Sequence, residues 1–365
     1  MKILSPAKTP EEVRSVIHAG AGEIYCGVMP ASWRKQYTNM VSPNRREWEV
    51  SNMADFGVLR QSIAIAHAAD VPVFLALNAL YTEKQYDALR DFVSEAMGCD
   101  VDALIIADIG LLLMVKEMGW DKDIHISTGG TTFNNETVQF YRDLGASRVI
   151  LPRQNRLSEI TAIAEDANDI EIESFVLNRG CKNIDGFCTF HHGVNEVRIP
   201  LWWRLPKKWH WDYYLLNCMK RLPLSVRERL ARTSMFGSVG ACFLSYDIDV
   251  ESDTADATAK ETLHRTLRDN FNLFSGLDTC GACSLWQLQA AGIDSLKIVG
   301  RSNPLQKKVR DVEFLRQCID MIPSCASAEA FCDEVRAAYT KTYGFSCDSW
   351  CYYPAKDAEL GPGEL

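Results

Sequence analysis

Long apolar runs are missing from this chain of 365 residues. The longest candidate, around Ile109–Val115, is far shorter than the roughly 20 apolar residues that a membrane-spanning helix needs. Met1 leads directly into a short strand-like run and then Ser5-Pro6, without the basic start and apolar centre of a secretory signal. These absences predict a cytoplasmic protein without a transmembrane segment.

Positive charge is also in short supply, because 39 Lys and Arg residues stand against 48 Asp and Glu residues and the formal net charge is −9. Such a chain is not expected to bind polyanions over its whole surface. Two protease signatures, His-Glu-x-x-His and Gly-x-Ser-x-Gly, do not occur. Since a catalytic triad is assembled in space from distant residues, this absence argues against a peptidase without excluding one.

Cysteine, by contrast, is abundant, with 13 residues. In a reducing cytosol these are not expected to form a disulfide framework, so metal binding or catalysis is the better interpretation. Four of them, Cys26, Cys99, Cys318 and Cys325, stand singly in apolar surroundings. These four are predicted to be small buried hydrophobic residues.

Short apolar runs alternate along the chain with segments of helical period, which predicts a parallel sheet. Thr9-Pro10 followed by two glutamates has the composition of a helix start. Seven strands precede residue 180 and an eighth follows much later, so we expect a TIM-like (β/α)8 barrel, with an open doubly wound sheet as the alternative. The expected strands are Lys2–Leu4, Glu23–Gly27, Val71–Leu77, Ala103–Ala107, Asp123–Ser127, Arg148–Leu151, Ile170–Val176 and Ser295–Val299.

The expected barrel is interrupted by a long Cys-rich insertion between strands seven and eight. Residues 1–180 hold the first seven β/α units, and 181–290 form the insertion with its metal-binding and substrate residues. Residues 291–325 supply the closing strand and helix, and 326–365 form a C-terminal extension. The insertion is expected at the C-terminal face of the barrel, where the active sites of this architecture are built.

Three sequence blocks carry a family resemblance. Residues 173–188 combine an acidic residue, an aromatic residue, and the cysteines Cys181 and Cys188, each near a glycine. Gly240-Ala241-Cys242 forms a second block, and Gly292–Arg301 a third. In this order the blocks resemble those of the peptidase U32 family, and the chain is identified as a member of that family.

The resemblance implies a cofactor. The family name comes from reported collagenase-like proteolysis, whereas other members resemble iron–sulfur proteins that hydroxylate RNA bases or ubiquinone precursors without molecular oxygen. In those relatives four cysteines hold a [4Fe–4S] cluster. Cys181, Cys188 and Cys242 match three of them, and Cys280 or Cys283 is the candidate for the fourth. Relatives usually carry an acidic residue where Val299 stands.

From the residues alone, the thiolate pairs Cys181/Cys188 and Cys280/Cys283 suit an iron–sulfur cluster or zinc equally well. The resemblance favours the cluster, with zinc as the alternative. Cys347 and Cys351 form another close pair, which either supplies a ligand, builds a second site or consists of two ordinary cysteines.

Candidate catalytic residues follow from position. His191 and His192 come shortly after Cys188, where either could act as an acid or base near neutral pH. Polar residues at the C-terminal ends of barrel strands are expected to contact substrate, and the arginines among them could grip a carboxylate or phosphate. Each could instead make a cap or loop hydrogen bond. These residues are Asn78, Asp108, Ser127, Thr128, Arg153, Asn178 and Arg301.

The segment from Arg198 to Arg232 contains nine Lys or Arg residues, two acids and four tryptophans. Cations that follow phosphates and aromatic faces that stack on bases are typical of single-stranded nucleic-acid binding. The same composition suits peripheral membrane contact, or a lid or dimer surface.

The residues themselves indicate a metal site at a barrel mouth, and the resemblance implies a redox enzyme that hydroxylates an RNA base or an aromatic or isoprenoid small molecule without oxygen. A collagenase-like peptidase is the first alternative. The second is a non-catalytic iron–sulfur or zinc subunit of a complex with a related chain, since some relatives act in pairs.

Overall fold

The computed structural model of the protein describes residues 1–37, 42–46, 51–167, 169–181, 183–187, 198–200, 236–238, 279–347 and 351–353. The chain divides into two compact units, one formed by Met1–Cys188 with Gly276–Leu365 and the other by Thr189–Ser275. In the second unit the described residues form two short antiparallel strands, β8 (Arg198–Pro200) and β9 (Phe236–Ser238).

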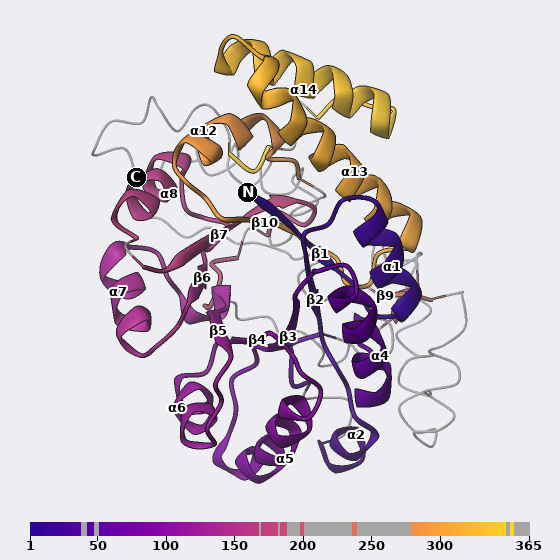
Figure 1. The fold of residues 1–365 in the computed structure, drawn as a ribbon, viewed down its shortest axis with the longest axis vertical. Helices are drawn as coiled ribbons and strands as arrows, with labels where there is room; N and C mark the ends of the chain where they lie inside the picture. The colour runs from indigo at the N-terminus through magenta and orange to yellow at the C-terminus, as the bar shows by residue number, and fades with distance from the viewer. Residues whose placement is uncertain are drawn as a thin grey trace, which may run out of the picture. The chain divides into compact units, whose positions relative to one another are not determined.

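The first unit is a closed barrel of eight parallel strands, seen from one end in Figure 1. Around the ring the order is β1, β10, β7, β6, β5, β4, β3 and β2, so the late strand β10 closes the gap between the first strand and the seventh. This confirms the TIM-like barrel and excludes the open doubly wound sheet. The strands are β1 (Lys2–Pro6), β2 (Glu23–Cys26), β3 (Val73–Leu77), β4 (Ala103–Ile106), β5 (Asp123–Ile126), β6 (Arg148–Ile150), β7 (Glu171–Leu177) and β10 (Ser295–Ile298).

Helices surround the strands (Figure 1). They are α1 (Pro10–His18), α2 (Ala31–Tyr37), α4 (Phe56–His67), α5 (Tyr86–Met97), α6 (Ile109–Glu117), α7 (Asn135–Asp143), α8 (Leu157–Asp166), α12 (Leu285–Ala290), α13 (Leu305–Met321) and α14 (Ala328–Tyr343). Short 3₁₀ turns lie at Glu83–Gln85 (η2), Thr128–Gly130 (η3), Ala282–Ser284 (η7) and Ile322–Ser324 (η8). None of the described helices is long and apolar enough to cross a membrane.

The start of α1 shows how local sequence sets a helix boundary. Thr9 is the N-cap, and its hydroxyl accepts a hydrogen bond from the backbone N–H of Glu12 at 3.1 Å. Pro10 occupies the first turn, where its missing N–H leaves no bond unmade. Beyond the helix, Gly20 adopts a φ of +107°, a conformation that side-chain-bearing residues rarely take. Thr9-Pro10 thus marks the start of α1 in the sequence, and Gly20 marks its end.

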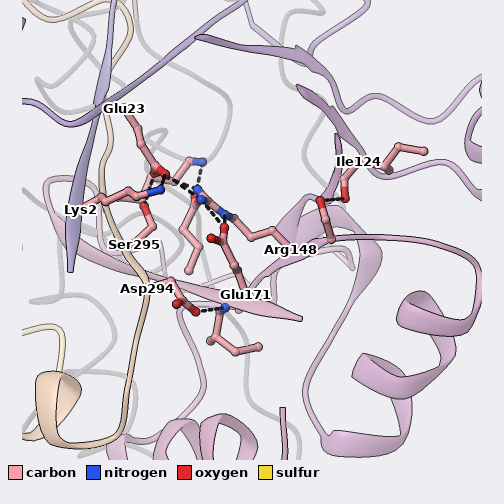
Figure 2. Close-up of polar contacts among 11 residues, drawn as sticks. Lys2, Glu23, Ile124, Arg148, Glu171, Asp294 and Ser295 are labelled. Carbon is pink, nitrogen blue, oxygen red and sulfur yellow. Dashed lines mark hydrogen bonds and ion pairs between the residues drawn. The ribbon is translucent and has the colours of Figure 1, made fainter. Parts of the chain in front are cut away.

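Charged side chains fill the N-terminal end of the barrel interior (Figure 2). Arg148 on β6 reaches across the ring to Glu23 on β2, and its two terminal nitrogens donate to the two carboxylate oxygens at 2.8 and 2.7 Å. Arg148 also donates to Glu171 through Nε at 2.7 Å and to Glu173 at 3.3 Å. Lys297 on β10 donates to the second oxygen of Glu173 at 2.6 Å.

Arg148 and both Glu23 and Glu173 are almost completely removed from solvent, with side-chain exposures of 2% and 0%. Burial alone would raise the pKa of Glu23, but the bonds from Arg148 and Ser295 lower it below its ordinary value. The network therefore keeps its charges because each buried ion has hydrogen-bonded partners of opposite sign.

Replacing Arg148 with Met should lower the free energy of unfolding by about 3–5 kcal/mol, because Glu23 and Glu173 lose their shared cation in a buried place. Urea denaturation of the full chain measures this change. Arg142→Met on the exposed face of α7 is the matched control and should cost less than about 1 kcal/mol. Equal losses in the two variants would contradict the assignment of Arg148 as the centre of the network.

His125 on β5 is a buried titratable group beside this network. Its ring contacts Phe74 with 4.5 Å between ring centroids, and its Nδ1 has no hydrogen-bond partner among the described residues. Burial, followed by the positive charges of Arg148 and Lys297, holds the pKa of His125 well below its ordinary value of 6.5. The folded protein therefore keeps this imidazole neutral while the unfolded chain takes up a proton.

This proton uptake predicts a loss of stability in mild acid. Between pH 6.5 and 5.5 the free energy of unfolding should fall by about 1 kcal/mol through His125 alone, because only the unfolded chain binds the proton. His125→Phe should remove that part of the slope. Denaturation curves at a series of pH values test this, and a wild-type slope in His125→Phe would contradict it.

Candidate active site at the barrel mouth

The C-terminal ends of the strands carry Arg301, one of the predicted site residues, in a cradle built from the loop after β2. Its guanidinium donates to the backbone oxygen of Asn44 at 2.9 Å, to the Asn44 side chain at 3.1 Å and to Asn52 at 3.4 Å. Gly27 is required beside it, because an added Cβ would lie 2.1 Å from an Arg301 nitrogen. Lys308 holds the Arg301 backbone oxygen at 2.8 Å.

Arg301 is one of four arginines whose charges act on one another at the mouth. Burial, and then the charges of Arg179, Arg301 and Arg153, lower the pKa of Arg46. Burial likewise lowers the pKa of Arg301, whose guanidinium is bonded to neutral acceptors only. No ion pair within the described ranges joins Arg46 or Arg301 to a carboxylate. Arg153, Arg179 and Arg301 each place positive charge near Arg46, and such a group of cations forms a site that an anion would stabilise.

Arg153, which follows β6, is paired with a carboxylate. Its Nη1 donates to Asp185 at 2.6 Å, and its guanidinium lies 4.1 Å from the ring centroid of Phe175. Burial alone would lower its pKa, but Asp185 raises the pKa above the ordinary value. Its side chain is 10% exposed, and its Nε has no partner among the described residues. Arg153 thus retains one donor for a ligand.

The neighbouring Gln154 fixes the loop that carries Cys181. Its side-chain nitrogen donates to the backbone oxygens of Cys181 at 3.0 Å and Asn183 at 2.7 Å, and its oxygen accepts from the N–H of Asp185 at 3.1 Å. The Asn183 amide lies 3.7 Å from the Cys181 sulfur. Cys181 is half-buried and its charge would act on Arg153. A thiolate at this position has a hydrogen-bond donor and a cation nearby, which fits a cluster ligand.

The backbone turns sharply between β7 and Cys181. Asn178 and Arg179 both have positive φ, at 67° and 41°, which is uncommon for residues with side chains. Asn178 is held in this conformation because its amide donates to Asp311 at 2.8 Å and accepts from Lys307 at 2.6 Å. Its side chain is therefore structural, and its role is to aim Arg179 and Cys181 from the end of β7.

Three other residues that were predicted to contact substrate, Asp108, Asn78 and Ser127, make local hydrogen bonds. Asp108 is the N-cap of α6 and accepts from the Leu111 N–H at 2.8 Å, from the Tyr86 hydroxyl at 3.0 Å and from the Tyr81 N–H at 3.2 Å. Its carboxylate is thus occupied by capping bonds. Asn78 donates to Ser127 at 3.1 Å, and its own oxygen is buried without a partner among the described residues.

The remaining predicted ligands are distributed differently. Cys280 and Cys283 lie beside Cys332, Cys347 and Cys351, near the start of α12 and α14. Cys188, His191, His192, Cys242 and, apart from the backbone of β8, the basic aromatic segment 198–232 fall outside the described residues. The described part of the chain holds no preformed group of three metal-ligating side chains. Of the cysteines predicted to be buried in apolar surroundings, Cys26, Cys99 and Cys318 are buried as expected, and Cys325 is half-buried.

A family comparison agrees with the resemblance in the three sequence blocks. The sequence model described as peptidase family U32 matches residues 8–199 and 207–359. The chain belongs to peptidase family U32. This confirms the family expected from the blocks around Cys181, Cys242 and Arg301.

Two curated relatives and one solved structure illustrate the similarity. The tRNA hydroxylation protein P of Haemophilus influenzae is 26% identical over 330 residues, which cover 87% of this chain and 67% of that protein. The 23S rRNA 5-hydroxycytidine synthase of Escherichia coli is 25% identical over 193 residues, or 53% of this chain and 26% of the synthase. The solved structure of the U32 peptidase Mk0906 is similar over 48% of this chain and 68% of its own, with 14% identity and a TM-score of 0.38.

Sequence reasoning missed two of the four mouth arginines. Arg46 lies in the segment between β2 and α4, to which no element was assigned, although a loop after a barrel strand is itself a signal. Arg179 lies within the first sequence block, directly before Gly180-Cys181, and its position in the sequence alone indicates no role. The left-handed turn after β7 brings Arg179 near the other arginines, and the sequence did not reveal this turn.

The arginine cluster predicts opposite effects on binding and on stability. Arg46→Met should weaken sulfate binding at least tenfold, on the order of the 1.5–3 kcal/mol of a charged hydrogen bond. The same variant should raise the free energy of unfolding by about 1 kcal/mol, because one repelled, partly buried cation is removed. Calorimetric titration with sulfate and urea denaturation measure the two effects. Arg142→Met on α7 should change neither, and weaker binding together with lower stability would contradict the prediction.

Proposed function

We propose that this chain is an RNA-modifying enzyme that hydroxylates a base of tRNA or rRNA, with the reaction at the barrel mouth. The supporting observation is the cluster of Arg46, Arg153, Arg179 and Arg301 in a protein of net charge −9. A local positive site in an acidic molecule selects one place for a phosphate and disfavours contact elsewhere. The relatives named for tRNA and rRNA hydroxylation give the substrate class.

The side chains of the mouth have distinct tasks in this proposal. Arg46 and Arg301 hold a phosphate of the RNA, and the unpartnered Nε of Arg153 donates to the nucleotide that enters the barrel. Asp108 is not included, since its carboxylate caps α6.

Cys181, Cys188 and Cys242, with Cys280 or Cys283 as the fourth ligand, are proposed to hold a [4Fe–4S] cluster. Such a cluster, when bound, would supply one-electron transfer. Converting a C–H bond of the base to C–OH adds one oxygen atom and removes two electrons, so the reaction also needs a co-substrate that supplies the oxygen and accepts the electrons. The contribution of the chain around Cys181 is orientation: Gln154 fixes the loop backbone, and Asn183 and Arg153 stabilise negative charge on sulfur. The donor set argues for a cluster over an open catalytic zinc because all the proposed ligands are thiolates.

The test is complementation in a bacterial host from which its own U32 RNA hydroxylases have been deleted. Anaerobically purified protein should contain about four irons per chain. The host RNA should regain a hydroxylated nucleoside, detected by mass spectrometry of digested tRNA and rRNA. Cys181→Ser should lose iron and product, and Arg301→Lys should keep iron while product falls by roughly tenfold or more, because a bidentate grip becomes a point charge.

Cys325→Ser, which changes a half-buried cysteine on the loop between η8 and α14, is the matched control and should retain iron and product. Iron-loaded protein that restores no hydroxylated nucleoside would overturn the proposal. Peptide cleavage by iron-free protein that survives Cys181→Ser would favour the peptidase alternative.

A further inference from the structure

A tight turn shortly after Cys181 carries two exposed apolar side chains at the barrel mouth. The backbone N–H of Phe187 donates to the oxygen of Ile184 at 3.0 Å, and the third residue of the turn, Gly186, has a φ of +91°. These are the hydrogen bond and the glycine position of a type II β-turn. Because the first and last Cα atoms of such a turn lie within about 7 Å of each other, Ile184 and Phe187 are neighbours.

Both apolar residues of the turn are unusually exposed. Phe187 is 68% exposed, the highest value among the large apolar side chains that the structure describes, and Ile184 is 52% exposed. A single apolar residue on a surface needs no partner to explain it. What distinguishes this phenylalanine is the number of contacts that fix the backbone beneath it.

The first set of contacts joins the turn to the loop after β6. Asp185, the second residue of the turn, accepts from the backbone N–H of Arg153 at 3.1 Å and from the Arg153 guanidinium at 2.6 Å. Its own N–H donates to the side chain of Gln154 at 3.1 Å. The Asp185 side chain is 12% exposed, so these bonds are largely protected from water.

The second set of contacts joins the turn to the loop after β5. A Cβ added to Gly186 would lie 2.0 Å from the Thr131 side chain and 3.4 Å from the backbone oxygen of Gly129, so the two loops pack directly together. The turn is therefore held between two loops of the mouth, while its apolar end residues remain in solvent. A backbone that is already in place lowers the entropic cost of binding a ligand through Phe187.

The turn also adjoins the arginine cluster. Asp185 is paired with Arg153, whose Nε has no partner among the described residues and whose charge acts on Arg46. A ligand that meets both Arg153 and Phe187 must combine negative charge with an apolar surface. Single-stranded RNA has this combination at every nucleotide, a phosphate beside a planar base. An anionic lipid has it too, but acyl chains are buried by a broad apolar face, whereas this turn offers one ring and one aliphatic side chain.

We propose that Phe187 stacks on a base of the RNA next to the nucleotide held at the arginine cluster, with Ile184 beside it. This inference rests on the proposed function, because it takes RNA as the substrate, and it adds which part of an RNA is accepted. A base within a helix is already stacked on its neighbours, whereas an unpaired base can offer its face to an aromatic side chain. The Ile184–Phe187 turn therefore selects unpaired nucleotides, such as those of loops.

Binding of a short, unstructured, fluorescently labelled RNA to the anaerobically purified full chain tests the proposal. Phe187→Ala should weaken binding by about tenfold, as expected for the loss of one base stack. Its iron content and its affinity for sulfate should stay unchanged, because the cysteines and arginines are intact. Phe187→Trp should restore the affinity, and Phe187→Leu only part of it, since leucine is apolar without a planar face. Phe140→Ala, at an exposed phenylalanine on α7, is the matched control and should bind like wild type.

A second probe separates stacking from a general disturbance of the loop. A phosphodiester chain of the same length without bases should bind wild type and Phe187→Ala equally, because it offers charge but no ring. A tenfold loss for this chain as well would overturn the proposal.

The remaining outcomes distinguish this proposal from the proposed function. Equal affinity of wild type and Phe187→Ala for the unstructured RNA would overturn the stacking role, while a hydroxylated nucleoside in the complemented host would still support the proposed function. Wild-type protein that binds no RNA would overturn both. Binding to vesicles of anionic phospholipid that depends on Phe187, without RNA binding that does, would overturn the proposal in favour of a membrane contact.

Discussion

The bidentate pair of Arg148 and Glu23 spans the interior of the barrel. The structure at the N-terminal end of the barrel depends on the mutual neutralisation of these two buried charges. The two residues come from strands on opposite sides of the ring, so their contact fixes the barrel diameter as well as the charge. Glu171 and Glu173 surround the same guanidinium, and Lys297 together with Lys2, whose Nζ lies 3.4 Å from Glu23, balances the excess of carboxylates. Since unpaired charges in such a place are strongly destabilising, the buried members of the network, Arg148, Glu23, Glu173 and Lys297, must be present together.

At the opposite end of the same barrel, the buried positive charges are only partly neutralised. Arg301 is buried and Arg46 half-buried, and neither is paired with a carboxylate among the described residues, whereas Arg153 is paired with Asp185. A cation near like charges raises the free energy of the unliganded protein, and a bound anion recovers that energy. The barrel therefore separates its tasks along its axis: complete neutralisation at the N-terminal end supports stability, and incomplete neutralisation at the C-terminal end supports binding.

The sequence predicted the barrel well because its signals are local. Strand bounds follow from short apolar runs, and the cap at Thr9 and the glycine after α1 mark helix ends. The apolar residues of Ile109–Glu117 fall on every side and show no helical period, so the sequence marks α6 only through the glycine that follows it, Gly119. It also treated α14 only as part of a C-terminal extension. The mouth was predicted in part: Arg153 and Arg301 follow strands directly, whereas Arg46 is brought there by a loop whose path depends on Asn44 and Asn52.

Cysteine spacing shows the same limit. The family pattern makes Cys280 or Cys283 the candidate for the fourth cluster ligand, and spacing cannot say which face of a strand end a side chain will occupy. After β7 the chain makes a left-handed turn at Asn178 and Arg179 before it reaches Cys181, while the backbone of Cys280 pairs with Leu177 and with Cys351 of the tail. The Tyr352 hydroxyl donates to the backbone oxygen of Asn178, so the tail contacts the same turn. The backbone around these cysteines is therefore set by contacts between segments that lie far apart in the chain, which local spacing does not reveal.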